Sequence, residues 1–302
     1  MTDPRQAWTS FWTDAGRASQ ACLPDAPGID RALRAAWRDF AGTLRKGARV
    51  LDLATGDGTV LARMAGARPD LKLTGVDYAA ALPPAPRGVK LKSGVSIEAL
   101  PFADGSFDAV TSQFGIEYAD QQRSVAELAR VLGGGGRFQL VVHNHSSPVL
   151  GHNRARAVAL RWAARDSGYL TRANQFARLG SSSGLPIPPL FRAAPNEARA
   201  AFPGQPVAAE FVTAILQSLE LGRRGPPEQT VNALSVLAAK AEHELARIAA
   251  LEAAALDTVG VTGLAAALTD AGLAVDAPAT LDDPDSRRPF AWVIAGRSPA
   301  KP

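Results

Sequence analysis

Short apolar runs typical of β-strands recur along the first half of the chain. Five short runs of this kind lie at 48–54, 71–78, 89–94, 106–115 and 136–143. Helical patterns separate most of the runs, as at 61–67 and 122–132. Strands that alternate with helices need crossover connections, so the pattern predicts an α/β fold with a doubly wound, mostly parallel sheet.

A helix is also predicted ahead of the first strand. Apolar residues recur there on one helical stripe, at Leu33, Trp37, Phe40 and Leu44. Asp30 precedes this stripe and is expected to cap the helix. We expect the apolar stripe to pack on the sheet.

A run of four glycines, at 133–136, follows the helical pattern at 122–132. Because it comes after a helix, it offers no helix N-terminus to an anion. We therefore interpret it as a flexible turn before the fifth strand.

The pattern changes after about residue 146. Helix-prone segments follow at 154–165 and 228–256, with a Gly/Ser/Pro loop at 179–189. Strand patterns return only near the end, within 263–275 and at 289–297. The fifth strand is thus separated from the closing elements by a helical insertion far longer than ordinary connections.

Composition limits the classes of partner. The chain has 33 Lys and Arg against 29 Asp and Glu, with no long block of like charge, so nucleic acid is not expected as a partner. Cys22 is the single cysteine and can form neither an intramolecular disulfide nor a cysteine-based zinc site, which fits a reducing cytoplasm. Neither a signal-peptide pattern nor an apolar run of membrane-spanning length is found, so we expect a cytoplasmic protein without a membrane partner.

The stretch VLDLATGDGTV, at 50–60, suggests a ligand site. An apolar run ends there and turns through Gly56 and Gly58, and such a turn lets the backbone approach a ligand beyond a strand. Asp77 ends the next strand, where its carboxylate could accept both hydroxyls of a ribose. A dinucleotide fingerprint needs a third glycine where this chain has Leu61. This disfavours an NAD-dependent oxidoreductase. Asp52, the acid before the turn, suits a cofactor with an ammonium and a sulfonium group better than one with two phosphates, although packing alone can also explain such turns.

Four motifs in order resemble those of class I S-adenosylmethionine-dependent methyltransferases: VLDLATGDGT, GVDY, LPFADGSFDAV and ELARVLGGGGRF. The resemblance covers 48–144 closely and 263–297 loosely, and is to methyltransferase domains of the 11/25 type found in small-molecule and quinone methyltransferases. It implies S-adenosyl-L-methionine as the cofactor.

The resemblance also implies a set of cofactor-binding residues: Asp52, Ala54, Thr55, Gly56, Gly58, Asp77, Tyr78, Ser96, Ile97, Gln113 and Phe114. In that family Asp77 would hold the ribose and Tyr78 would flank the adenine. Ser96 stands where the family often has an acid at the adenine amino group. Ala54 replaces a frequent glycine.

Methyl transfer needs a base only when the accepting nucleophile carries a proton. Candidates for a base or an acceptor contact lie near the ends of the fourth and fifth strands, at His143, His145, Glu117 and Tyr118, with His152 further on. For each single histidine the alternative is a hydrogen-bonded loop residue. His143, His145 and Glu117 lack a further ligand pattern, so no metal is expected.

With the resemblance, the chain divides into four parts. They are an N-terminal helical lid and packing helix (1–46), the cofactor-binding α/β core (47–148), the helical insertion (149–260), and a last helix and strands (261–302) that complete a seven-stranded Rossmann-like sheet. The insertion is expected to form an acceptor pocket or the contact of a homodimer. The Arg-rich helix at 154–165 then faces the acceptor or is a solvated face.

The predicted function is transfer of a methyl group to an O, N or C nucleophile of a small or medium-sized acceptor, of natural-product, phenolic or quinone-like chemistry. Two alternatives stay open: a binding module or pseudo-enzyme that acts through its helical region, and a methyltransferase that acts on a peptide. Three aromatic residues near the N-terminus, Trp8, Phe11 and Trp12, are interpreted either as helix packing or as a cover over the cofactor.

Overall fold

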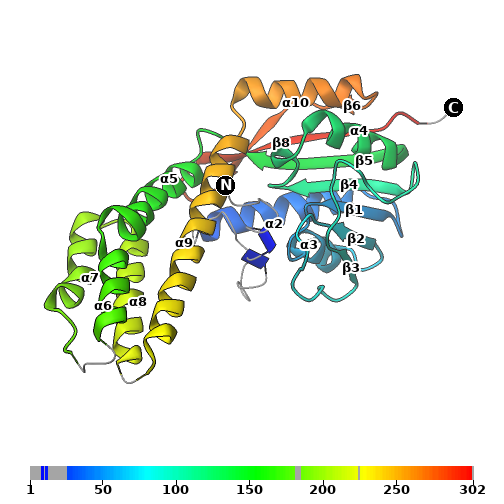
Figure 1. Cartoon of the computed structure of the whole chain (residues 1–302). Helices are drawn as coiled ribbons and strands as arrows, with labels where there is room; N and C mark the ends of the chain where they lie inside the picture. Colours follow the sequence, from blue (N-terminus) through cyan, green and yellow to red (C-terminus); the bar gives the residue numbers. More distant parts are fainter. Residues whose placement is uncertain (1–7, 10, 13–25, 181–184, 224, 301–302) are drawn as a thin grey trace. The chain divides into compact units, whose positions relative to one another are not determined.

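The computed structural model of the chain describes residues 8, 9, 11, 12, 26–180, 185–223 and 225–300 (Figure 1). The chain divides into two compact units. The first consists of Met1–Gly151 and Ala250–Pro302, and the second of His152–Ala249. Cys22 lies outside the described residues.

One mixed sheet forms the centre of the first unit. Its strands are β1 (Arg49–Leu53), β2 (Lys72–Val76), β3 (Val89–Lys92), β4 (Phe107–Gln113), β5 (Leu132–His143), β6 (Ala274–Val275), β7 (Ala279–Asp283) and β8 (Arg288–Arg297). They lie in the order β3-β2-β1-β4-β5-β8-β6, with β7 paired to β8. Strands β1 to β5 are parallel, and β8 runs antiparallel to β5. The order reverses between β1 and β4, which is where open α/β sheets bind ligands.

Helices cover both faces of this sheet (Figure 1). α2 (Pro27–Gly42) and α3 (Thr59–Ala67) pack on one face, and α4 (Gln121–Val131) and α10 (Thr258–Asp270) on the other, each pair with its own apolar core. The helices cover both faces of the sheet, so four of the five residues of β1 are buried. The predicted fold class, an α/β sheet with a helical insertion after the fifth strand, is confirmed.

The sheet has one strand more than the seven predicted from sequence. The extra strand is β7, which pairs only with β8. Its residues are mostly exposed and include two aspartates, so the apolar pattern that identifies a strand is missing there.

The predicted cap of the first helix is wrong. α2 begins at Pro27, after Ala26, whose side chain makes no capping bond. Proline suits the first helical position because its φ is preset and it has no N–H to leave unpaired. Asp30 lies inside the first turn, where its carboxylate pairs with Arg34 and Arg63.

The predicted turn at 133–136 is also wrong, because these glycines lie within β5. Leu132 pairs with Phe107, and the register then shifts, as in a β-bulge. A Cβ on Gly136 would lie 2.8 Å from the Gly133 carbonyl oxygen, so the close backbone approach requires glycine.

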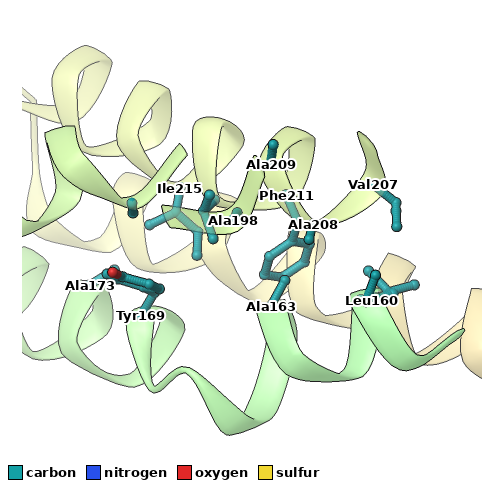
Figure 2. Close-up of a cluster of buried hydrophobic side chains, with 14 of the residues drawn as sticks. Leu160, Ala163, Tyr169, Ala173, Ala198, Val207, Ala208, Ala209, Phe211 and Ile215 are labelled. Carbon is teal, nitrogen blue, oxygen red and sulfur yellow. The ribbon is translucent and has the colours of Figure 1, made fainter. Parts of the chain in front are cut away.

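The second unit is helical throughout its regular structure and contains its own core. It holds α6 (Tyr169–Gly180), α7 (Pro189–Ala201), α8 (Pro206–Gly222), a π-helical turn (Trp162–Asp166), and most of α5 (Pro148–Arg161) and α9 (Pro227–Ala254). Figure 2 shows part of the core, in which Leu160, Tyr169, Phe211 and Ile215 are buried together.

Ion pairs fix the Arg-rich segment of the second unit. Arg156 and Arg165 pair with Glu244 and Glu242 of α9. Tyr169 is buried and its hydroxyl donates to Glu197. These side chains therefore have structural partners within the unit. Among the helices that the structure describes, none is long and apolar enough to cross a membrane.

Candidate functional site

The turn after β1 carries three residues in the left-handed region. Ala54, Gly56 and Gly58 have φ of 54°, 55° and 77°. Glycine adopts this conformation freely, whereas a non-glycine residue seldom does. The N–H of Thr55 donates to the Val76 carbonyl at 2.9 Å, which ties the turn to the end of β2.

Gly58 has a packing role as well. It is the N-cap of α3, and a Cβ there would lie 3.1 Å from Pro86 Cδ and 3.4 Å from Leu91 Cδ2. The glycine thus allows a left-handed turn and the close packing of the segment before β3.

Asp77 joins the carboxyl ends of β1 and β2. Its Oδ2 accepts the Gly56 N–H and its Oδ1 accepts the Ala79 N–H, both at 2.9 Å. Burial raises the pKa of Asp77, and the two backbone N–H groups oppose that rise. Since an ionised carboxylate offers about four acceptor positions, these two bonds leave capacity for a ligand hydroxyl.

Asp52 is enclosed between β1 and β4. Only 1% of the residue is exposed, and its Oδ1 accepts the Thr111 hydroxyl at 2.7 Å. Burial raises the pKa of Asp52 to about 7, and the charge of Asp77 adds to that rise. The two acids thus have different surroundings: Asp52 is enclosed between strands, whereas Asp77 braces the turn.

Phe114 is a second strained residue, at the end of β4. It has φ of 55°, and its ring stacks on His143 with centroids 4.1 Å apart and planes 9° apart. Non-glycine residues in this conformation cluster at functional sites. The strand order reverses between β1 and β4, and each of these strands is followed by one such residue, Ala54 after β1 and Phe114 after β4.

Glu117 lies in the short 3-10 helix η1 (Ile116–Tyr118) and is buried. Its Oε1 accepts the backbone N–H of His143 at 2.9 Å. Burial raises the pKa of Glu117 to about 7, against the effect of backbone hydrogen bonds that favour the charged form. Oε2 has no hydrogen-bond partner among the residues that the structure describes.

The imidazole of His143 is fully buried. Burial lowers the pKa of His143 to about 3, so the ring is neutral at physiological pH. Within the described part of the chain, neither ring nitrogen has a hydrogen-bond partner. The Tyr118 ring meets the imidazole edge-on, with centroids 6.1 Å apart. The structure thus brings together three of the four candidates for a base or an acceptor contact.

The other histidines have different surroundings. His145 follows β5, and its backbone N–H donates to the Leu256 carbonyl at 3.0 Å. His152 lies on α5 in the second unit, where burial and then Arg156 lower its pKa. Among the described residues, no group of three or more His, Cys, Asp or Glu side chains is arranged to hold a metal ion.

The remaining predicted cofactor residues lie in varied environments. Tyr78 is 48% exposed, beside Asp77. Gln113 Oε1 accepts the indole N–H of Trp37 at 2.7 Å. Ser96 Oγ accepts the N–H of Glu98, while Ile97 belongs to an apolar core.

The sequence pattern does not indicate that Thr111 donates a hydrogen bond to Asp52 or that Trp37 donates one to Gln113. Both partners are remote in sequence from the groups they bind. Thr111 could have been found only from the strand register, which places it directly opposite Asp52.

Comparison with known proteins adds to this geometry. Residues 51–140 match the family model described as a methyltransferase domain. The ubiquinone/menaquinone biosynthesis C-methyltransferase UbiE of Geobacter sp. (strain M21) is 37% identical over 138 residues, covering 41% of this chain and 56% of the relative. The demethylmenaquinone methyltransferase of Thermus thermophilus is 38% identical over 98 residues, covering 30% of this chain and 44% of the relative. The chain thus spans about half the length of the curated relatives it matches.

Among solved structures, the 1,6-didemethyltoxoflavin-N1-methyltransferase of Burkholderia thailandensis is similar at 12% identity and a TM-score of 0.47. The alignment covers 99% of this chain and 92% of the other, but likeness at this level supports no conclusion about function.

Residues 51–140 thus match a methyltransferase domain, in agreement with the family that the four motifs resemble. A methyltransferase domain of this kind implies S-adenosyl-L-methionine as the cofactor. The turn at Gly56 and the spare acceptor positions of Asp77 fit such a ligand, which has a ribose diol to bind.

Proposed function

We propose that this protein transfers a methyl group from S-adenosyl-L-methionine to an O, N or C nucleophile of a small or medium-sized acceptor, of natural-product, phenolic or quinone-like chemistry. The observation that carries the proposal is Asp77, held by two backbone N–H groups at the end of β2 and beside a left-handed glycine turn. The names of the relatives, which act in quinone biosynthesis, support the choice of acceptor chemistry.

Asp77 would hold the ribose, and the backbone of Gly56 and Gly58 would allow the methionine part to approach the end of β1. When bound, the cofactor supplies a methyl group already activated by a sulfonium. The protein must then align the nucleophile with that methyl and exclude water. The buried positions of Glu117 and His143 favour such an environment.

Glu117 is the better candidate for the base. Its pKa, raised to about 7 by burial, lets the carboxylate accept a proton near neutral pH, which is the condition for efficient proton transfer. His143 has its pKa lowered to about 3 and would hold a proton poorly. We assign His143 and Tyr118 to acceptor contact or to the support of Glu117. A base is needed only if the acceptor nucleophile carries a proton.

The test has two stages. Calorimetry on the full chain should detect binding of S-adenosylmethionine and S-adenosylhomocysteine, and a screen of phenols, quinols, amines and peptides should reveal a product heavier by one methylene. The test variant is Asp77→Asn, which is expected to weaken cofactor binding. Its matched control is Asp57→Asn in the turn after β1, which is expected to retain cofactor binding. Absence of cofactor binding would contradict the proposal. Binding without turnover on any acceptor would favour a binding module that acts through its helical region.

Three further expectations from the sequence stay predictions: acceptor selection by the insertion at 149–260, a homodimer through that insertion, and a cytoplasmic location. Size-exclusion chromatography with light scattering would test the homodimer directly.

A further inference from the structure

Three contacts attach described N-terminal residues to the carboxyl edge of the sheet. The Trp12 ring lies against Gly56, since a Cβ built on that glycine would be 2.4 Å from Trp12 Cζ2. The Thr9 hydroxyl oxygen accepts the N–H of Ala80 at 3.0 Å. Each contact has its partner just beyond a strand end.

The third contact is aromatic. Trp8 meets Tyr118 edge-on, with ring centroids 5.7 Å apart and planes 90° apart. Phe11 lies between the two tryptophans, 6.0 Å from Trp8 and 4.9 Å from Trp12 by ring centroids. Trp8, Phe11 and Trp12, named here the N-terminal aromatic group, thus extend from the end of β1 to the segment after β4.

The positions of these contacts indicate more than core packing. Gly56 follows β1, Ala80 follows β2 and Tyr118 follows β4, so the three anchors mark the edge where the cofactor site is proposed. All three rings of the group are only partly buried. Trp12 also contacts the one residue of the turn whose N–H is bonded to Asp77.

We propose that Trp12 contacts the bound cofactor and that its indole ring recognises the positive charge of the sulfonium. This inference rests on the proposed function, since it requires the cofactor to bind beside Gly56. Trp has the strongest attraction for a cation among the aromatic side chains, and the attraction increases when water is excluded. The N-terminal aromatic group would exclude water by covering the ends of β1, β2 and β4.

The charge of the ligand gives a specific test. S-adenosylmethionine carries the sulfonium, whereas S-adenosylhomocysteine has a neutral thioether and otherwise the same binding groups. A ring that only supports the turn would affect both ligands equally. A ring that faces the sulfonium affects the charged ligand more.

Calorimetry should compare both ligands on the full-length wild type, Trp12→Phe, Trp12→Leu and the control Trp162→Phe from the second unit. For Trp12→Leu we expect S-adenosylmethionine to bind about 10-fold more weakly, and its preference over S-adenosylhomocysteine to fall about 3-fold or more. Trp12→Phe should lie between Trp12→Leu and the wild type, because phenylalanine keeps an aromatic face. Trp162→Phe should match the wild type.

Equal weakening of both ligands would overturn the assignment to the sulfonium. Tighter binding by Trp12→Leu would also overturn it, since it would mean that the ring competes with the cofactor for space. Trp12→Phe keeps the test decisive should the leucine variant fold poorly. Failure of the wild type to bind either ligand would instead overturn the proposed function, and this inference with it.

Discussion

The methyl group of Ala54 occupies the space that a side chain on Gly115 would need. A Cβ built on Gly115 would lie 2.4 Å from Ala54 Cβ and 3.0 Å from Ser112 Oγ. Ala54 has φ of 54°, which costs an alanine about 1–2 kcal/mol. The strained alanine after β1 and the glycine after β4 are thus a matched pair at the switch point, although 61 positions separate them in the printed sequence, from 54 to 115.

This relationship predicts a compensating pair of substitutions. Gly115→Ala should destabilise the protein by about 2 kcal/mol or more, because two methyl carbons cannot be so close. Ala54→Gly removes the opposing methyl and the left-handed alanine, and should stay within about 1 kcal/mol of the wild type. The double variant should recover at least about 1 kcal/mol of the loss, measured by urea unfolding as a double-mutant cycle. Strictly additive free energies would show that the two residues do not compete for this space.

A second prediction concerns Asp77. An amide at this position must turn one N–H₂ group toward Gly56 N–H or Ala79 N–H, so Asp77→Asn loses at least one charge-assisted bond. We expect a loss of about 1–3 kcal/mol in the free energy of unfolding and at least about 10-fold weaker binding of S-adenosylmethionine. The structure thus adds a stability cost that the sequence alone did not predict, because it shows the carboxylate bracing the turn.

Asp57→Asn is the matched control for Asp77. Asp57 lies in the same turn, and its Oδ1 accepts the N–H of Thr59 at 3.0 Å. Asparagine can keep that bond through its own carbonyl oxygen. Cofactor affinity should change little, and an equal loss in both variants would mean that charge in the turn, rather than the position of Asp77, controls binding.

The inner strands of the sheet, such as β1 and β4, were predictable because they are buried on both faces. That environment selects mostly apolar runs, which the sequence shows before any pairing is known. In β1 these are Val50, Leu51 and Leu53. β7 has no such signal, because most of its residues are exposed. Its pairing with β8 becomes apparent only in the tertiary structure. The bulge in β5 has no distinct sequence signal, because a glycine run looks the same in a turn and in a crowded strand.

The turn of the candidate site was predictable from the sequence, whereas the residues that contact the site were less so. Gly56, Gly58 and Asp77 stand at fixed places in recognisable motifs. The enclosure of Asp52 depends on the register that sets Thr111 opposite it, and no local pattern encodes a register. The contact of Trp12 with Gly56 likewise depends on tertiary structure.

A third prediction concerns the second unit. Phe211 is buried in its core, so Phe211→Ala should cost about 3–5 kcal/mol. Hydrogen exchange should then increase within 152–249. If the insertion selects the acceptor, methylation should fall while cofactor affinity is retained.

The control for Phe211 is Leu221→Ala in the same helix, α8, because Leu221 is 85% exposed. This variant should leave both exchange and methylation near the wild type. Loss of cofactor binding in Phe211→Ala would contradict the assignment of separate roles. Full methylation by that variant, with raised exchange, would place acceptor selection outside the second unit.

The last prediction is a pH dependence caused by Glu117. Burial raises the pKa of Glu117 to about 7 in the folded protein, whereas a glutamate in an unfolded chain has a pKa of about 4.3. Between these values the folded state keeps a proton that the unfolded state has lost, so this group makes stability fall as pH rises from about 4 to about 7. Above pH 7 the cost is complete, and below pH 4 it is absent. Its size is at most about 4 kcal/mol, at about 1.36 kcal/mol for each pH unit between the two pKa values.

Glu117→Gln removes this ionisation, and the glutamine can still accept the backbone N–H of His143 through its amide oxygen. The variant should resemble the wild type at pH 4.5 and be more stable at pH 8, by up to about 4 kcal/mol, in urea unfolding followed across that range. Asp52→Asn is expected to act in the same direction, because burial also raises the pKa of Asp52 to about 7. If Glu117 is the base, its variant should also lose the rise in methylation rate through pH 7, which Asp52→Asn should keep. Parallel stability curves for Glu117→Gln and the wild type would contradict the raised pKa, and an unchanged rate profile would remove Glu117 from proton transfer.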